Sequence, residues 1–126
     1  MPEKICDFAL QHVSNTYDRD GDKLLVHVNW KTDAEIDVYG AVFGTLIVEH
    51  DMKNPNAKSG PCRWQGETFM ADGTRVMGWQ EGTWETTSEH AWTLKMEGWD
   101  SLSGDLSTES EMKLETLRWE GAVYKR

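Results

Sequence analysis

Cationic residues are scarce in this chain, and their scarcity excludes one class of partner. Only 13 Lys and Arg stand against 22 Asp and Glu, which leaves a net charge of −9. Nucleic-acid phosphates attract clustered Lys and Arg, and anionic membrane surfaces attract the same side chains. We therefore expect neither nucleic acid nor a membrane as a partner. We interpret the negative charge as an acidic surface that keeps the protein in solution.

Long hydrophobic runs and cysteines are also few. No apolar stretch approaches the roughly 20 residues that a transmembrane helix needs. The opening MPEKICDFALQHVSN has no basic start followed by an apolar centre, so it does not resemble a signal peptide. Cys6 and Cys62 are too few for a disulfide framework. These features predict a cytoplasmic protein with reduced thiols.

Familiar catalytic and metal-binding motifs are missing as well. The sequence contains no GxxxxGK[ST], no GxSxG and no HExxH. Its histidines are widely separated, so a metal site would need ligands from distant segments. Asp18–Asp22 (DRDGD) is similar to the start of a calcium loop, but it lacks the closing Glu of an EF-hand, and we interpret it as a turn. We predict no metal and no cofactor.

Short segments of alternating polar and apolar residues fill the chain instead. Turns rich in Gly, Asp and Ser separate them, and Asp72-Gly73 is the strongest hairpin signal. A short helix is an alternative for the first segment only, because periodicity over so few residues is ambiguous. The predicted strands are Ile5–Ser14, Lys23–Thr32, Ile36–Glu49, Pro61–Met70, Arg75–Thr86, Ala91–Trp99, Leu106–Glu115 and Leu117–Tyr124.

A series of strands joined by short turns tends to close on itself, because closure removes exposed strand edges. We therefore predict one domain, residues 1–126, that folds as an all-β, antiparallel, up-and-down barrel of about eight strands. A two-sheet β-sandwich is the alternative. Eight strands leave an interior wide enough for side chains or for one small ligand.

Glycines inside the predicted strands leave their register open. Gly40, Gly44, Gly78 and Gly82 each mark a bulge, a bend or a close backbone approach. A slip of one residue there would exchange inner and outer side chains.

Two further segments carry alternative interpretations. Val42–Val48 is apolar on both faces, which suggests a homodimer that covers its outer face. His50–Gly60 is the longest loop, and it is either a plain connection or a lid over the barrel mouth.

Several short motifs repeat in the second half of the chain. Trp64-x-Gly66 and Trp119-x-Gly121 flank the Asp72-Gly73 hairpin and the segment Gly82-Thr83-Trp84. In these motifs the run from Cys62 to Arg126, about half of the chain, resembles small lipocalin-like barrels, including those similar in shape to allene oxide cyclase. The resemblance implies a barrel and carries over no functional residue.

Strand alternation also predicts which side chains reach the interior. An aromatic wall with a few convergent polar groups is typical of small-molecule sites, although core packing explains each tryptophan taken singly. The inward ligand-binding set is Trp30, Trp64, Thr68, Trp92, Thr108, Ser110 and Trp119. His90 and His12 are the candidate catalytic residues, because histidine transfers protons near neutral pH. A solvated strand end is the alternative for His90.

Three functions fit this pattern. The first is a module that binds a small, apolar or aromatic molecule between tryptophans. The second is a cofactor-free isomerase, cyclase or lyase in the same cavity, with His90 or His12 moving a proton. The third is a filled barrel whose segment Val42–Val48 makes subunit contacts. The first two predict a cavity, and the third does not.

Overall fold

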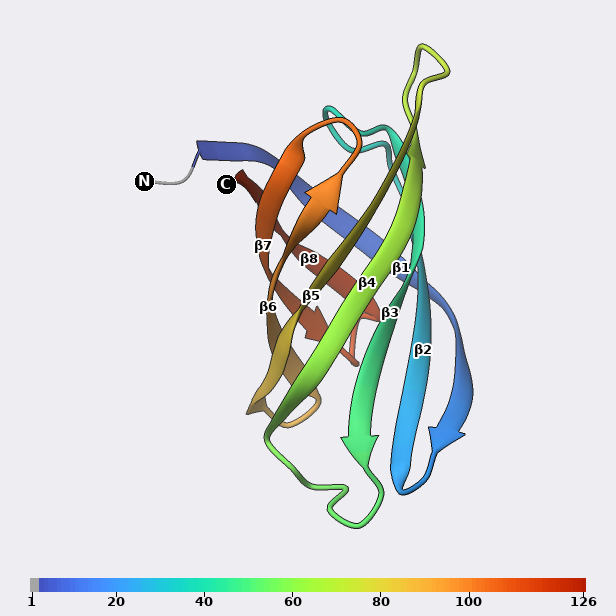
Figure 1. Cartoon of the computed structure of the whole chain (residues 1–126), viewed down its shortest axis with the longest axis vertical. Coiled ribbons are helices and arrows are strands. Elements are labelled where there is room, and N and C mark those ends of the chain that lie inside the picture. Colours follow the sequence, from blue (N-terminus) through green and yellow to red (C-terminus); the bar gives the residue numbers. More distant parts are fainter. Residues whose placement is uncertain (1–2) are drawn as a thin grey trace.

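A computed structural model describes residues 3–126, and all the regular structure in this part of the chain is β-strand (Figure 1). Each strand pairs with the next in antiparallel fashion and the last returns to the first, so the sheet is a closed barrel. The predicted up-and-down barrel is confirmed, and a two-sheet sandwich is excluded. The strands are β1 (Glu3–Asp20), β2 (Lys23–Thr32), β3 (Ala41–Asp51), β4 (Ser59–Phe69), β5 (Arg75–Ser88), β6 (Ala91–Asp100), β7 (Gly104–Lys113) and β8 (Arg118–Lys125).

Strand β1 is much longer than the predicted Ile5–Ser14. Its first half pairs with β8 and its second half with β2, so one long strand closes the barrel. The polar segment after Ser14 continues as strand because β2 supplies its hydrogen-bond partners. The predicted Asp18–Asp22 turn shrinks to a tight hairpin in which Gly21 adopts a φ of 60°. Nowhere in residues 3–126 is there a helix long and apolar enough to cross a membrane.

The predicted strand Ile36–Glu49 is wrong at its start. Residues Ile36–Gly40 form a tight loop closed by mutual backbone hydrogen bonds, and β3 begins only at Ala41. Val38 and Gly40 have φ values of 77° and 79°, a backbone conformation that a strand does not contain. The loop turns the side chain of Tyr39 into the barrel, where it is buried.

The interior glycines mark close approaches rather than bulges. The register of β3, β4 and β5 runs without a shift through Gly44, Gly66 and Gly78. The ring of Trp64 occupies the space that side chains at Gly44 and Gly66 would fill. The inward face predicted for β4, which carries Trp64 and Thr68, therefore keeps its assignment, and the register left open around the glycines of β3 and β5 is continuous.

Three tryptophans pack together across the middle of the barrel. Trp119 contacts Trp64 and Trp30, with ring centroids 5.2 and 5.5 Å apart. The indole of Trp119 donates a 2.7 Å hydrogen bond to the hydroxyl of Ser110, so its N–H is satisfied in the core. We call Trp30, Trp64 and Trp119 the tryptophan layer, and it divides the interior along the barrel axis.

The outer face of β3 is only partly exposed. Phe43 is 44% exposed, whereas Ile47, which also points outward, is only 4% exposed. Ile47 lies in a shallow groove with Leu25 and Arg63 of the flanking strands. Side chains of the same chain thus cover part of the segment Val42–Val48, whose apolar outer face suggested a homodimer. The homodimer stays a prediction.

Candidate functional site

Two cavities lie on opposite sides of the tryptophan layer. One has a volume of about 90 Å³ and is lined by Trp64, Trp119 and Tyr39. The other has a volume of about 240 Å³ and is lined by Trp30 and His50. We call them the Tyr39 cavity and the His50 cavity. The first lies at the barrel end that carries the loop between β2 and β3, and the second at the end that carries the loop between β3 and β4 (Figure 1).

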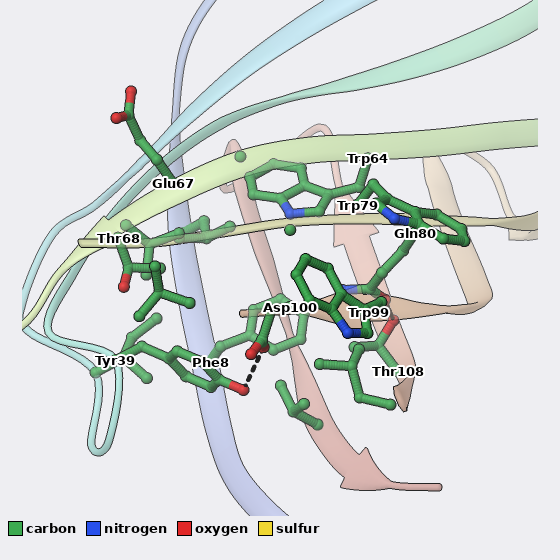
Figure 2. Close-up of a pocket in the computed structure, with 18 of the residues that line it drawn as sticks. Phe8, Tyr39, Trp64, Glu67, Thr68, Trp79, Gln80, Trp99, Asp100 and Thr108 are labelled. Atoms are coloured by element: carbon green, nitrogen blue, oxygen red, sulfur yellow. Dashed lines mark hydrogen bonds between the residues drawn. The ribbon is translucent and has the colours of Figure 1, made fainter. Parts of the chain in front are cut away.

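A buried polar network lies in the wall of the Tyr39 cavity. The hydroxyl of Tyr39 donates a 2.7 Å hydrogen bond to Asp100 Oδ2, as Figure 2 shows. Asp100 Oδ1 accepts the backbone N–H groups of Leu102 and Ser103 at 2.9 and 2.6 Å. Burial raises the pKa of Tyr39, so its hydroxyl stays protonated at neutral pH. The network fixes the loop before β3 to the turn after β6.

The Tyr39 cavity is small for an organic ligand. An apolar cavity of about 150 Å³ holds benzene, and this one measures about 90 Å³. Its main polar groups already bind one another, since Thr108 Oγ1 donates to Gln80 Oε1 at 2.6 Å. Thr68 is buried there, and its hydroxyl has no partner among residues 3–126. We interpret this region as a packed end of the barrel, where hydrogen bonds hold the loop before β3 in place.

The His50 cavity is larger and mostly apolar. Its volume of about 240 Å³ exceeds that of the benzene-binding cavity by more than half. Strands on every side of the barrel contribute to its wall. Aliphatic and aromatic side chains dominate, namely Val26, Val28, Trp30, Val48, Trp84, Trp92, Met112, Leu114 and Leu117, and the polar lining residues are His12, Asn15, His50 and Lys113.

Both histidines of this cavity lie against tryptophans. The ring of His12 meets Trp30 edge to face at 5.7 Å, and its Nε2 is 2.7 Å from Asn15 Oδ1. The ring of His50 meets Trp84 at 4.9 Å with the planes inclined by 43°. Burial lowers the pKa of His50, so its imidazole is uncharged at neutral pH.

The residues predicted to form one site are split between the two cavities. Those that line the Tyr39 cavity are Trp64, Thr68, Thr108 and Trp119. Those that line the His50 cavity are His12, Trp30 and Trp92. Ser110 is buried but lines neither cavity, because its hydroxyl is held by the indole of Trp119. The alternation pattern placed these side chains inside correctly but could not show that the tryptophan layer separates them.

The inward placement predicted for His90 is wrong. His90 lies in the exposed turn between β5 and β6 and lines neither cavity. Its φ of 62° belongs to the turn, so the strand alternation that we extended to it does not hold there.

His50, which does line a cavity, was not predicted from the sequence, because the sequence pattern assigned His50 to the loop His50–Gly60. It belongs to β3, and the inward series Leu46, Val48 would have placed it on the cavity wall.

The cysteines offer no reactive nucleophile. Cys6 and Cys62 are both free and buried. Burial raises the pKa of Cys6 to about 11 and that of Cys62 to about 12, so both stay protonated at neutral pH. Within residues 3–126, no cluster of three or more His, Cys, Asp or Glu side chains could hold a metal ion.

Comparison with known proteins adds no relative to this picture. No protein-family model, no curated protein and no solved structure matches the chain. The lipocalin-like resemblance therefore stays a prediction.

Proposed function

We propose that this barrel binds a small, flat, largely apolar molecule in the His50 cavity. The observation that carries the proposal is an apolar space of about 240 Å³ in the barrel interior. Trp30, Trp84 and Trp92 line this space, and tryptophan supplies a large, flat contact area to an aromatic ligand. A barrel filled for purely structural reasons would not keep such a space.

The volume of the cavity limits the size of the ligand. Since about 150 Å³ suffices for benzene, 240 Å³ suits a molecule of one or two fused rings. A dissociation constant near 1 μM corresponds to about −8.2 kcal/mol. A ligand of about ten non-hydrogen atoms would need about −0.8 kcal/mol per atom to reach this binding free energy. That lies within the limit of about −1.5 kcal/mol per atom for the best very small ligands.

Tryptophan fluorescence during titration with naphthalene tests the proposal. We expect saturable quenching, since Trp84 and Trp92 line the cavity. Val48→Phe fills part of the cavity and should weaken binding at least tenfold. Val42→Phe is the matched control, because Val42 is a buried valine on the same strand that lines the other cavity.

Two results would overturn the proposal. The first is no saturable quenching by naphthalene, benzene or indole. The second is equal weakening by Val48→Phe and Val42→Phe when circular dichroism shows both variants folded.

A second candidate is a cofactor-free isomerase, cyclase or lyase that acts on such a molecule. The observation in its favour is that His12 and His50 line the same cavity. A neutral imidazole can accept a proton from carbon next to a carbonyl group. Deuterium exchange at the α-carbons of 2-indanone, followed by NMR in D₂O, would reveal this activity. Exchange no faster than in buffer, with 2-indanone shown to be bound, would exclude proton abstraction from this ligand.

A further inference from the structure

The packing around His50 holds its imidazole at the wall of the His50 cavity. His50 is on β3 and Trp84 is on β5, and Gly60 of the strand between them pairs with Trp84. A side chain at Gly60 would meet the indole of Trp84 at 2.7 Å. Because glycine leaves that space open, the indole crosses β4 and packs on the imidazole of His50. This tilted contact between the two rings limits rotation of the imidazole.

The wall also carries His12, Asn15 and Lys113, which have protein partners, and the indole N–H groups of Trp30 and Trp84, which have no hydrogen-bond partner among residues 3–126. His12 and Asn15 bind each other at 2.7 Å, and Asn15 also donates to the hydroxyl of Tyr17 at 3.3 Å. Lys113 forms an ion pair with Glu111 at 3.3 Å. Within the described wall, the imidazole of His50 has no such side-chain partner, and burial is the cause of its lowered pKa.

We infer that His50 is the specificity-determining residue of this cavity, and that its imidazole binds the hydroxyl group of an uncharged aromatic alcohol. The inference rests on the binding function proposed above. It narrows the ligand class from any small aromatic molecule to phenol-like or naphthol-like ones.

The chemistry of the wall favours a hydroxyl over a carboxylate. A neutral imidazole offers one acceptor nitrogen and one N–H donor, and a phenolic O–H is a good donor to that nitrogen. A carboxylate would enter a largely apolar cavity as an uncompensated charge, which is costly. The lysine among the lining residues, Lys113, has a side chain that is 53% exposed and already paired with Glu111. The net charge of −9 opposes an anion further.

Equilibrium dialysis against three ligands with the same ring system tests the inference. These are 2-naphthol, naphthalene and 2-naphthoate. We expect 2-naphthol to bind about three- to tenfold more tightly than naphthalene, which is the effect of one net hydrogen bond. We expect 2-naphthoate to bind most weakly.

Three variants assign the effect to one residue. His50→Phe keeps a flat ring against Trp84 and should abolish the advantage of 2-naphthol over naphthalene. His27→Phe is the matched control, because His27 lies on β2 and lines neither cavity, and it should leave that advantage intact. His50→Gln, which keeps a side-chain acceptor, should retain part of it and serves if His50→Phe does not fold.

The outcomes separate the two proposals. Naphthalene binding without any preference for 2-naphthol would overturn the inference and leave the binding function standing. A preference that is undiminished in His50→Phe, or in His50→Gln where His50→Phe does not fold, would do the same. No binding of any of the three ligands would overturn the binding function, and with it the inference.

Discussion

The imidazole of His50 and the indole of Trp84 lie against each other across strand β4, with ring centroids 4.9 Å apart. Gly60 makes this contact possible, since any side chain there would run into the indole. The same device recurs at the tryptophan layer, where Trp64 lies over Gly44 and Gly66. Glycine and tryptophan on neighbouring strands thus shape the interior together, as aromatic residues do over strand glycines elsewhere.

Substitution of Gly60 should show that the packing of Trp84 depends on a glycine at this position. Gly60→Ala places a methyl group 2.7 Å from Trp84 Nε1, and such overpacking costs about 1–3 kcal/mol of stability. The free energy of unfolding in urea measures the cost. In a double-mutant cycle with Trp84→Phe, the cost of Gly60→Ala should shrink, because the smaller ring removes the clash. Additive effects of the two substitutions would contradict this account.

Ser110 should stabilise the barrel through Trp119 rather than through a ligand. Ser110→Ala leaves the buried indole N–H without its 2.7 Å partner, and an unsatisfied buried donor costs about 1–3 kcal/mol. Ser107→Ala, on the same strand but not in the buried set, should change stability by less than about 0.5 kcal/mol. Chemical denaturation of both variants checks this. Equal effects would show that the hydrogen bond to Trp119 contributes nothing.

Tyr39 should hold the loop Ile36–Gly40 closed. Tyr39→Phe removes the hydroxyl that donates to Asp100 and accepts from Ser103, and a hydrogen bond to a charged group contributes about 1.5–3 kcal/mol. Amide hydrogen exchange of Ile36 and Gly40, whose N–H groups close the loop, should accelerate about tenfold or more. Tyr17→Phe, at a tyrosine that is 63% exposed, should leave these amides unchanged. Unchanged exchange in Tyr39→Phe would show that the loop is held by other contacts.

His50 should make the stability of the barrel depend on pH. Burial lowers its pKa below the usual value of about 6.5, so the unfolded chain takes up the proton first as the pH falls. The stability that His50 contributes is therefore complete above about pH 6.5 and is lost as the pH falls toward the lower folded-state pKa. His12 and Lys113 also line the cavity, and they remain in His50→Gln. The fall in Tm from about pH 7.5 to 5 should be smaller in His50→Gln than in the natural chain, and an identical fall would contradict the assignment.

The homodimer predicted from Val42–Val48 should depend on the exposed part of that segment. Phe43 packs edge to face with Phe69 on the outer surface, and both are more than 40% exposed. We expect sedimentation velocity to show a concentration-dependent dimer that Phe43→Asp abolishes, because a charge in an apolar interface is costly. Ile47 is not a suitable site for this test, since its own chain buries it. A monomer at all concentrations would contradict the predicted homodimer.

Much of the barrel was predictable from period-two alternation. Trp64, Thr68, Thr108 and Trp119 face inward as the pattern indicated, because neighbouring residues of a strand point to opposite sides of the sheet. Errors arose where the backbone leaves the extended region. Val38 and His90 both have positive φ values, and neither is a glycine that would have signalled this.

The sequence by itself determined the sheet, its closure and most of the inward side chains, since these follow from local alternation and from turn residues. Only the tertiary structure decided that the interior holds two cavities and that His12 and His50 share one of them. The reason is that this division depends on side chains from strands distant in sequence, chiefly Trp30, Trp64 and Trp119. Their indoles meet only after the barrel has closed, and neither their direction nor the space left beside them is encoded in the pattern of any single strand.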